Sequence, residues 1–321
     1  MTEAVVRVVT GSRLHFGMLS VHPAQGRRFG GVGAMIARPG IELEIRRSSG
    51  FKATGPLAER AVEAARRAAA ALNLKAEQGC SIAVLRAPPH HVGLGTGTQL
   101  AMAIAAGLNA LDGRPPLGPT DLAACVGRGE RSAVGLYGFI FGGLIYETGK
   151  ADDDPVSPIG RRLVLPAEWR FVLARPLGKI GISGDAERDA FARLPPLPDD
   201  EIAAIRREAL DRLLPAAAAA RFDEFSHSLY RFNHASGLSF AAQQGGPFNG
   251  PRLTQLVETI RRRGVEGVGQ SSWGPTIFAL LPNQAAAAQL VEALRAEAGM
   301  EDVEFQIAEP ESQGAAIEFR G

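Results

Sequence analysis

Two spacings of apolar residues alternate along the chain and predict both strands and helices. Residues 4–10, 41–47 and 81–86 are apolar, or alternate with polar positions, over the length of a strand. Residues 57–72 and 100–111 are longer segments typical of helices. The first half of the chain is therefore predicted to mix helices and strands.

The second half follows a segment rich in Pro and Asp, "ADDDPVSPIG" at residues 151–160, which predicts a linker or an exposed loop. A strand is predicted at residues 169–176 and helices near 200–218 and 222–237, followed by helix, strand, strand, helix and strand. The second of these two helices carries apolar residues at helical spacing, which predicts that they are core: Phe222, Phe225, Leu229 and Phe232. This interleaving predicts an α+β fold.

Length, charge and cysteine content narrow the classes of function. A chain of 321 residues is long enough for two domains, since domains usually hold about 100 to 200 residues each. With 35 Lys and Arg against 34 Asp and Glu, no overall basic field exists to recruit nucleic acid or a membrane surface, so a small-molecule partner is expected. No apolar segment reaches the length of a membrane span. Cys80 and Cys125 are expected to be reduced core residues of a cytoplasmic protein.

The segment "HHVGLGTGTQLAMAIA" at residues 90–105 places a glycine-rich turn directly before a predicted helix. The first turn of a helix leaves backbone N–H groups without partners and carries partial positive charge, so bare glycines there favour a bound phosphate or diphosphate. The alternative is a turn that merely needs glycine. The turn lacks the Lys-Ser/Thr of a P-loop and does not complete the dinucleotide pattern. The predicted diphosphate loop comprises Gly93, Leu94, Gly95, Thr96, Gly97, Thr98 and Gln99.

Two of these segments resemble the GHMP kinase superfamily. "GLGTGTQLAMAIA" is similar to its phosphate-binding motif, and "GQSSWGPTIFAL" at residues 269–280 lies where the superfamily has a C-terminal glycine-rich motif. The resemblance implies a domain like ribosomal protein S5 domain 2 at residues 1–160 and a ferredoxin-like domain at residues 161–321. It also suggests a homodimer.

The groups that kinases of this superfamily use for phosphoryl transfer are missing. When "SAVG" at residues 132–135 is aligned with their S-G-x-D stretch, Gly135 takes the position of the Asp that helps to activate the substrate hydroxyl, and Ala124 falls near the position of the Glu that holds Mg²⁺. A glycine cannot accept a proton and an alanine cannot ligate a cation, so phosphoryl transfer to an alcohol is not expected.

One branch of the superfamily matches over nearly the whole chain. "SRLHFGML", "GLGTGTQLA", "GRGERSAVG", "ISGDAERDAF" and "GQSSWGPT" together resemble the family of β-ribofuranosylaminobenzene 5′-phosphate synthases. The resemblance implies that 5-phosphoribosyl 1-diphosphate is joined to 4-aminobenzoate or 4-hydroxybenzoate as a C-riboside, with release of CO₂ and diphosphate, in the biosynthesis of tetrahydromethanopterin. The alternatives are an ATP-dependent kinase in which another acid replaces the missing Asp, and a non-catalytic ligand sensor.

The reaction implied by the resemblance requires groups for three anions, and the candidates follow from the matched motifs. Arg13 and His15 share side-chain parity in the first strand, so both can face one site, and with Arg131 they are the catalytic candidates. Trp273 is expected either to stack on the benzoate ring or to cover the core between the domains. Substrate binding is assigned to Arg128, Arg175, Lys179, Ser183, Asp185, Ser271, Ser272, Trp273 and Gly274. Mg²⁺ is expected as the cofactor, with Glu130, Asp185 and Glu187 as its candidate ligands.

Overall fold

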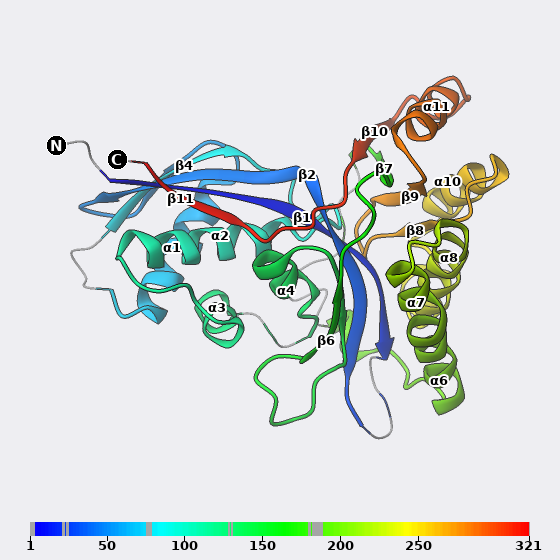
Figure 1. Ribbon diagram of the computed structural model, residues 1–321, viewed down its shortest axis with the longest axis horizontal. Coiled ribbons are helices and arrows are strands. Elements are labelled where there is room, and N and C mark those ends of the chain that lie inside the picture. The colour runs from blue at the N-terminus through cyan, green and yellow to red at the C-terminus, as the bar shows by residue number, and fades with distance from the viewer. Residues whose placement is uncertain are drawn as a thin grey trace.

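A computed structural model describes residues 4–20, 23, 26–74, 79–127, 129, 131–178, 181 and 189–320. Within these residues, seven strands form one sheet in the order β11-β1-β2-β4-β3, with β5 paired to β2 and β6 paired to β5. The strands of this sheet are β1 (Val5–Ser20), β2 (Phe29–Ser48), β3 (Lys52–Thr54), β4 (Gly79–Arg86), β5 (Leu144–Glu147), β6 (Ile159–Leu163) and β11 (Ala316–Arg320). Figure 1 shows β1 and β2 running as long neighbours through the molecule.

Strand β1 is longer than the alternation of its sequence predicts, because two irregularities interrupt the pairing with β2. The register shifts between Thr10 and Ser12 and again between His15 and Gly17. Such bulges reverse the side-chain alternation, so the pattern of period two fades near residue 10 while the strand continues to Ser20.

Four helices cover one face of this sheet: α1 (Ala58–Ala71), α2 (Thr96–Leu111), α3 (Pro119–Val126) and α4 (Val134–Phe141). They share one core with the strands, in which Val8 of β1, Leu43 of β2 and Ile82 of β4 meet the apolar side of α1 and α2. Small residues on α1, such as Ala61 and Ala65, are fully buried and allow the helix to pack closely on its neighbours.

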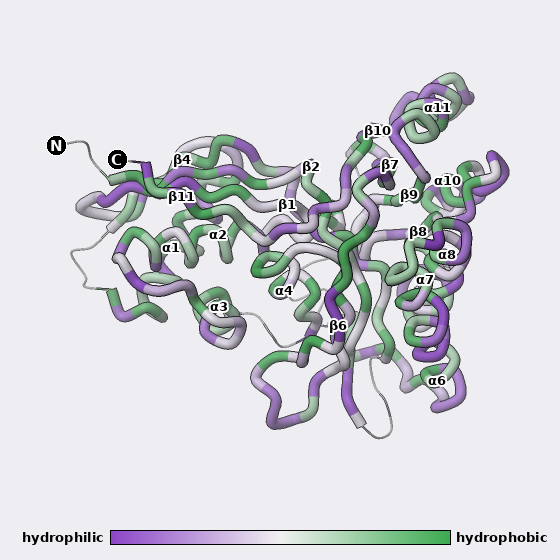
Figure 2. Tube along the Cα trace, viewed as in Figure 1, coloured by the Kyte–Doolittle hydropathy of each residue, from purple (hydrophilic) through white to green (hydrophobic). Residues whose placement is uncertain are grey.

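The second half of the chain builds a four-stranded sheet with helices on both faces. Its strands are β7 (Arg170–Pro176), β8 (Val268–Gln270), β9 (Ile277–Leu281) and β10 (Val303–Ala308), in the order β10-β7-β9-β8. Its helical elements are α6 (Asp199–Arg207), the π-helix η1 (Glu208–Leu213), α7 (Leu214–Ala218), α8 (Phe222–Leu238), α9 (Ala241–Gln244), α10 (Pro251–Arg262) and α11 (Gln284–Arg295). Figure 2 shows hydrophilic residues along the outer side of α6 and α8, as expected for helices that bury one face.

Alternate residues of the second sheet enter two different cores. Phe171 and Phe278 face α8 and the far part of β1, where they surround Phe16. Their neighbours Val172 and Ala279 face α10 and α11 instead. The predicted α+β class is therefore confirmed, and the core around Phe16 joins the two halves of the chain.

Two strands complete the first sheet although they come late in the sequence. β6 begins at the end of the Pro- and Asp-rich segment at residues 151–160, and β11 lies well beyond it. β6 pairs with β5, and β11 pairs antiparallel with β1, from Val5 opposite Arg320 to Val9 opposite Ala316. Cys80 and Cys125 are buried and free, as expected. Within the described residues, no helix combines the length and apolarity needed to span a bilayer.

The aromatic residues of α8 generate a prediction about stability. Phe225 is fully buried against Trp169, so Phe225→Ala should lower the free energy of unfolding by about 3–5 kcal/mol through lost burial and the cavity left behind. Urea denaturation followed by circular dichroism measures this value. Glu224→Ala, at an exposed position of the same helix, is the control and should change the free energy by about 0.5 kcal/mol or less. Equal effects of the two substitutions would contradict the packing described for α8.

Candidate active site

A cavity of about 630 Å³ lies where the two halves of the chain meet. Its wall is formed by the middle of β1, the glycine loop with the start of α2, the segment at residues 127–136, part of α8, and the segment at residues 270–274. Four of the sequence motifs therefore converge on one cavity, although they are spread over most of the chain.

The glycine loop presents the start of α2 to this cavity. Gly95 precedes the helix with a φ of 71°, a left-handed conformation that favours glycine, and no described side chain caps the helix. A side chain at Gly97, in the first turn, would meet only the Arg60 Nη1, at 3.9 Å. The Thr96 hydroxyl donates to the Pro89 carbonyl, and the Gln99 amide bonds to Thr10 and Gly135, so these two side chains support the loop from behind. The Thr98 amide bonds to the Gly95 carbonyl, so the described residues leave the amides of Thr96 and Gly97 and the Thr98 hydroxyl for a ligand.

The loop is held by direct contact with the C-terminal glycine-rich segment. A side chain at Gly274 would collide with the backbone of Gly93, so the two chain segments meet backbone to backbone. The Ser271 hydroxyl donates to the Gly93 carbonyl at 2.7 Å and accepts from the His15 amide at 3.0 Å. Thr276 donates to the Val92 carbonyl at 2.6 Å. We call this contact between residues 92–93 and 271–276 the glycine seam.

Basic side chains surround the glycine loop. Arg13 lines the cavity, and its backbone amide donates to the Leu94 carbonyl. Arg60 and Arg67, which sequence reasoning missed, reach the same cavity from α1. They are seven residues apart and therefore lie on one side of the helix, a spacing that could have drawn attention to them. These residues make this part of the wall suited to an anion.

His15 heads a hydrogen-bonded chain that leads away from the cavity. Its Nε2 lies 3.2 Å from the Ser132 hydroxyl, and that hydroxyl donates to Oε1 of Glu147 at 2.6 Å. Burial, with the charge of Arg13, holds the pKa of His15 well below its ordinary value, so the ring is neutral. Burial raises the pKa of the Glu147 carboxyl, while hydrogen bonds from Ser132 and the Ala133 amide oppose that rise. Glu147 was missed because it stands in an apolar strand outside any motif.

Another part of the wall is aromatic. Trp273 stacks on Phe191 at 4.8 Å between ring centroids, and Phe240 meets it edge-on at 5.2 Å. Arg131 lies over the Phe191 ring, with its guanidinium carbon 4.6 Å from the centroid. Trp273 is buried, and its indole Nε1 has no hydrogen-bond partner among the described residues.

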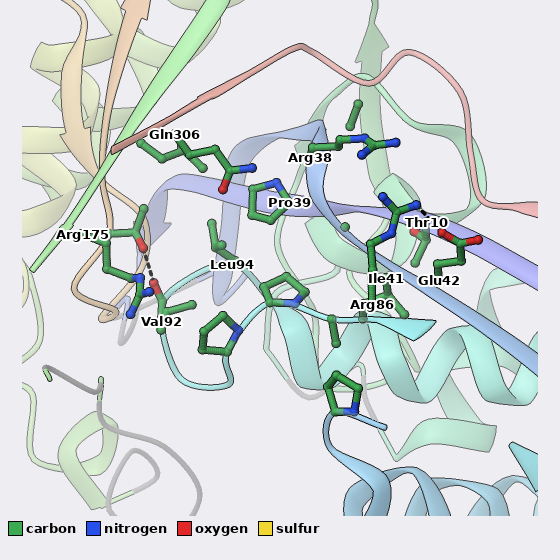
Figure 3. Close-up of a pocket in the computed structure, with 18 of the residues that line it drawn as sticks. Thr10, Arg38, Pro39, Ile41, Glu42, Arg86, Val92, Leu94, Arg175 and Gln306 are labelled. Carbon is green, nitrogen blue, oxygen red and sulfur yellow. Dashed lines mark hydrogen bonds and ion pairs between the residues drawn. The ribbon is translucent and has the colours of Figure 1, made fainter. Parts of the chain in front are cut away.

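The structure does not bring every predicted residue to this cavity. Arg175 faces a second cavity of about 460 Å³ and pairs with Glu304 on the neighbouring strand. Figure 3 shows Arg175 at one end of that second cavity and Arg86 with Glu42 at the other. Leu94 also lines the second cavity, whereas Ser272 and Gly274 line the first. Six candidates lie outside the described residues: Arg128, Glu130, Lys179, Ser183, Asp185 and Glu187.

The described residues do not by themselves provide a site for Mg²⁺. In the described part of the cavity wall there is no Asp or Glu, and across the described residues no three His, Cys, Asp or Glu side chains gather as a metal site would require. The described wall therefore fits an anion better than a cation held by protein carboxylates.

Comparisons with known proteins agree with this geometry. The sequence pattern of the GHMP kinases N terminal domain matches residues 57–143, and that of the GHMP kinases C terminal domain matches residues 213–299. A β-ribofuranosylphenol 5′-phosphate synthase from Archaeoglobus fulgidus is 30% identical over 293 residues, which cover 88% of this chain and 89% of that protein. The chain belongs to this synthase family, within the GHMP superfamily. A relative of the same name from Methanothermobacter thermautotrophicus is 28% identical and covers 84% of this chain and 87% of its own length.

Solved structures establish the same fold for this member of the synthase family. Homoserine kinase from Cytophaga hutchinsonii superimposes with a TM-score of 0.67 at 18% identity, over 99% of this chain and 98% of its own. Mevalonate diphosphate decarboxylase from Staphylococcus aureus gives 0.68 at 14% identity, with the same coverage. The predicted GHMP fold and family are therefore confirmed.

Gly135 lies beside Arg13 in this synthase-family cavity. Its carbonyl accepts from Gln99, and a side chain there would lie 3.9 Å from the Arg13 Nε. An Asp at this position, as in the kinase motif, would place a carboxylate against Arg13. The glycine instead keeps that negative charge out of the anion-binding part of the wall.

The start of α2 in the cavity wall leads to a prediction about anion binding. Gly97→Asp should lower the affinity for inorganic diphosphate at least tenfold, because a carboxylate then occupies the positive end of the helix. Isothermal titration calorimetry measures the affinity. Gly97→Asn, which has nearly the same size without the charge, is the matched control and should bind more tightly than Gly97→Asp. If the two variants bind alike, the helix start is not the diphosphate site.

Proposed function

We propose that the protein joins 5-phosphoribosyl 1-diphosphate to 4-hydroxybenzoate as a C-riboside, with release of CO₂ and diphosphate. Membership of the synthase family supports the reaction class. The names of the relatives, which describe a ribofuranosylphenol, favour an acceptor with a hydroxyl group over one with an amino group. The two free, buried cysteines are in keeping with a reducing, cytoplasmic setting.

The single observation that carries this proposal is that Arg13 and a helix start that no described side chain caps line one cavity. Diphosphate leaves the ribose C1 as a polyanion, so the bond breaks more easily where positive groups are already in place. The amides at the start of α2 and the guanidinium groups of Arg13, Arg60 and Arg67 provide that charge without a proton transfer.

The direction of β1 supports an order for the substrates along the cavity. Arg13 contacts the glycine loop, whereas Met18 packs against the cluster of Phe191, Phe240 and Trp273. In this proposal the diphosphate lies near Arg13, the aromatic acceptor lies near Phe191 with its carboxylate toward Arg131, and the ribose C1 lies between them. His15 stands on β1 between the two parts of the wall.

The chemistry then needs little acid–base catalysis. The ring carbon that bears the carboxylate attacks C1 as the bond from C1 to diphosphate breaks. The bond from that ring carbon to the carboxylate breaks next, CO₂ leaves, and its electron pair restores the aromatic ring. No proton is removed from carbon, which agrees with a cavity wall that has no carboxylate in its described part.

We also propose that Mg²⁺ accompanies the diphosphate. Mg²⁺ is commonly held by substrate phosphates together with one or two carboxylates. Glu130, Asp185 and Glu187 stay the predicted protein ligands. When bound, the ion would neutralise charge on the leaving group.

The reaction can be tested by its products. With 5-phosphoribosyl 1-diphosphate, Mg²⁺ and 4-hydroxybenzoate labelled in its carboxylate, the protein should release labelled CO₂ and diphosphate in equal amounts. Replacing the donor by ribose 5-phosphate should abolish CO₂ release, because no leaving group is then present. Formation of ADP from ATP and a small alcohol, without CO₂ release, would favour the kinase alternative. Binding of the substrates without turnover would favour a ligand sensor.

A further inference from the structure

Ser132 of the cavity wall and the buried Glu147 form a hydrogen-bonded pair that makes and breaks no bond in the proposed reaction. Glu147 is fully buried at the end of β5 and does not line the cavity. Burying a carboxylate is costly unless its oxygens are satisfied. Its described contacts are with groups that can donate: the Ser132 hydroxyl, the Ala133 amide at 2.8 Å and the Ser157 hydroxyl. The position is therefore built to hold an acceptor.

Donor and acceptor roles can be assigned to each hydrogen bond that links Glu147 to His15 through Ser132. The Ser132 hydroxyl has one hydrogen and two lone pairs. It gives the hydrogen to Oε1 of Glu147, because the contact of 2.6 Å is much shorter than the 3.2 Å to the imidazole nitrogen. The Val134 amide donates to one lone pair of Ser132, at 3.3 Å. The other lone pair is left for His15, so Nε2 of His15 must carry a hydrogen.

This assignment fixes the state of His15 at the cavity. The ring is neutral, so a hydrogen on Nε2 leaves Nδ1 with a lone pair. No described residue bonds to Nδ1, and His15 lines the cavity. Ser132 is not poised as a nucleophile, since its hydrogen is directed to Glu147 and away from the histidine.

We propose that Glu147 and Ser132 are positioning residues that lock His15 in the Nε2–H tautomer, so that Nδ1 accepts a hydrogen bond from a substrate hydroxyl. The hydroxyl comes either from the ribose or from the para position of the acceptor, and the two sources share this chemistry. The identity of these substrates rests on the proposed function, whereas the tautomer of His15 does not.

Glu147→Gln gives the sharpest test, because it should reverse the direction of the hydrogen bonds that link residue 147, Ser132 and His15. The Ala133 amide cannot turn, so the side-chain oxygen of the introduced glutamine must face it, and the side-chain NH₂ must face Ser132. Ser132 then accepts from that NH₂ and donates to His15 Nε2, which moves the ring hydrogen to Nδ1. The ¹⁵N resonances of labelled histidine distinguish the two tautomers, and a His15→Asn variant identifies the signals of His15.

We expect the Nε2–H tautomer in the unaltered protein and the Nδ1–H tautomer in Glu147→Gln. Ser157→Ala is the matched control: it removes another donor to Glu147 but leaves the link to His15, so the tautomer should not change. If Glu147→Gln does not fold, Ser132→Ala tests the same link and should leave a mixture of tautomers. A protonated ring or the Nδ1–H tautomer in the unaltered protein would overturn the proposal.

Binding measurements with each variant identify the source of the hydroxyl. If the acceptor supplies it, Glu147→Gln should weaken the binding of 4-hydroxybenzoate about 10- to 100-fold and that of benzoate little. If the 2-hydroxyl of the sugar supplies it, Glu147→Gln should weaken the binding of ribose 5-phosphate by a similar factor and that of 2-deoxyribose 5-phosphate little. If another hydroxyl of the sugar supplies it, the binding of both sugars should weaken. Unchanged binding of all four ligands would overturn the role of Nδ1. Absence of CO₂ release with a tautomer that switches as expected would instead refute only the proposed reaction.

Discussion

The glycine seam is the constraint on which the rest of the site depends. Gly93 and Gly274 come from different halves of the chain, and their backbones touch with no room for a side chain. On either side of Gly274, Ser271 and Thr276 donate hydrogen bonds to the Gly93 and Val92 carbonyls and stabilise this contact. Because the seam fixes the loop against the second sheet, the start of α2 points into a cavity instead of into solvent.

The glycine seam also helps to hold the irregular part of β1 in place at the interface. Ser271 accepts from the His15 amide, and Asn233 of α8 donates to the Phe16 carbonyl at 2.6 Å while it also pairs with Gln270. These bonds hold the irregular part of β1 at the interface, where the register shift after His15 redirects the strand. Beneath them, Phe16 packs against two aromatic rings of the second sheet. The interface is thus apolar at its centre and polar along the cavity, which positions Arg13 and His15 together.

Local chemistry explains which features the sequence could predict. The glycine loop and the shared side of Arg13 and His15 each follow from a few neighbouring residues, and the structure places both at one cavity. The family follows from short motifs spread along the chain. The spacing of Arg60 and Arg67 places them on one side of α1, but it could not assign them to the site, because the path of α1 past the loop is a tertiary property. Arg175 was assigned to the substrate on its charge, but in the register of β7 with β10 it stands opposite Glu304, which supplies its partner.

Glu147 illustrates the limit of motif reading most clearly. A single acid at the end of "LIYE" has no spacing that signals a function, and only the fold brings it behind Ser132. Its burial, and not its place in a motif, is what draws attention to it.

The return of β11 to the edge of β1 has a consequence for biogenesis. Residues 316–320 lie far from β1 in the sequence, yet they cover that strand's outer edge. During translation the emerging protein must therefore keep an unpaired, valine-rich strand edge until residues 316–320 have left the ribosome. Its vulnerability to aggregation should be greatest in that interval, and ribosome-bound chaperones would be most useful there.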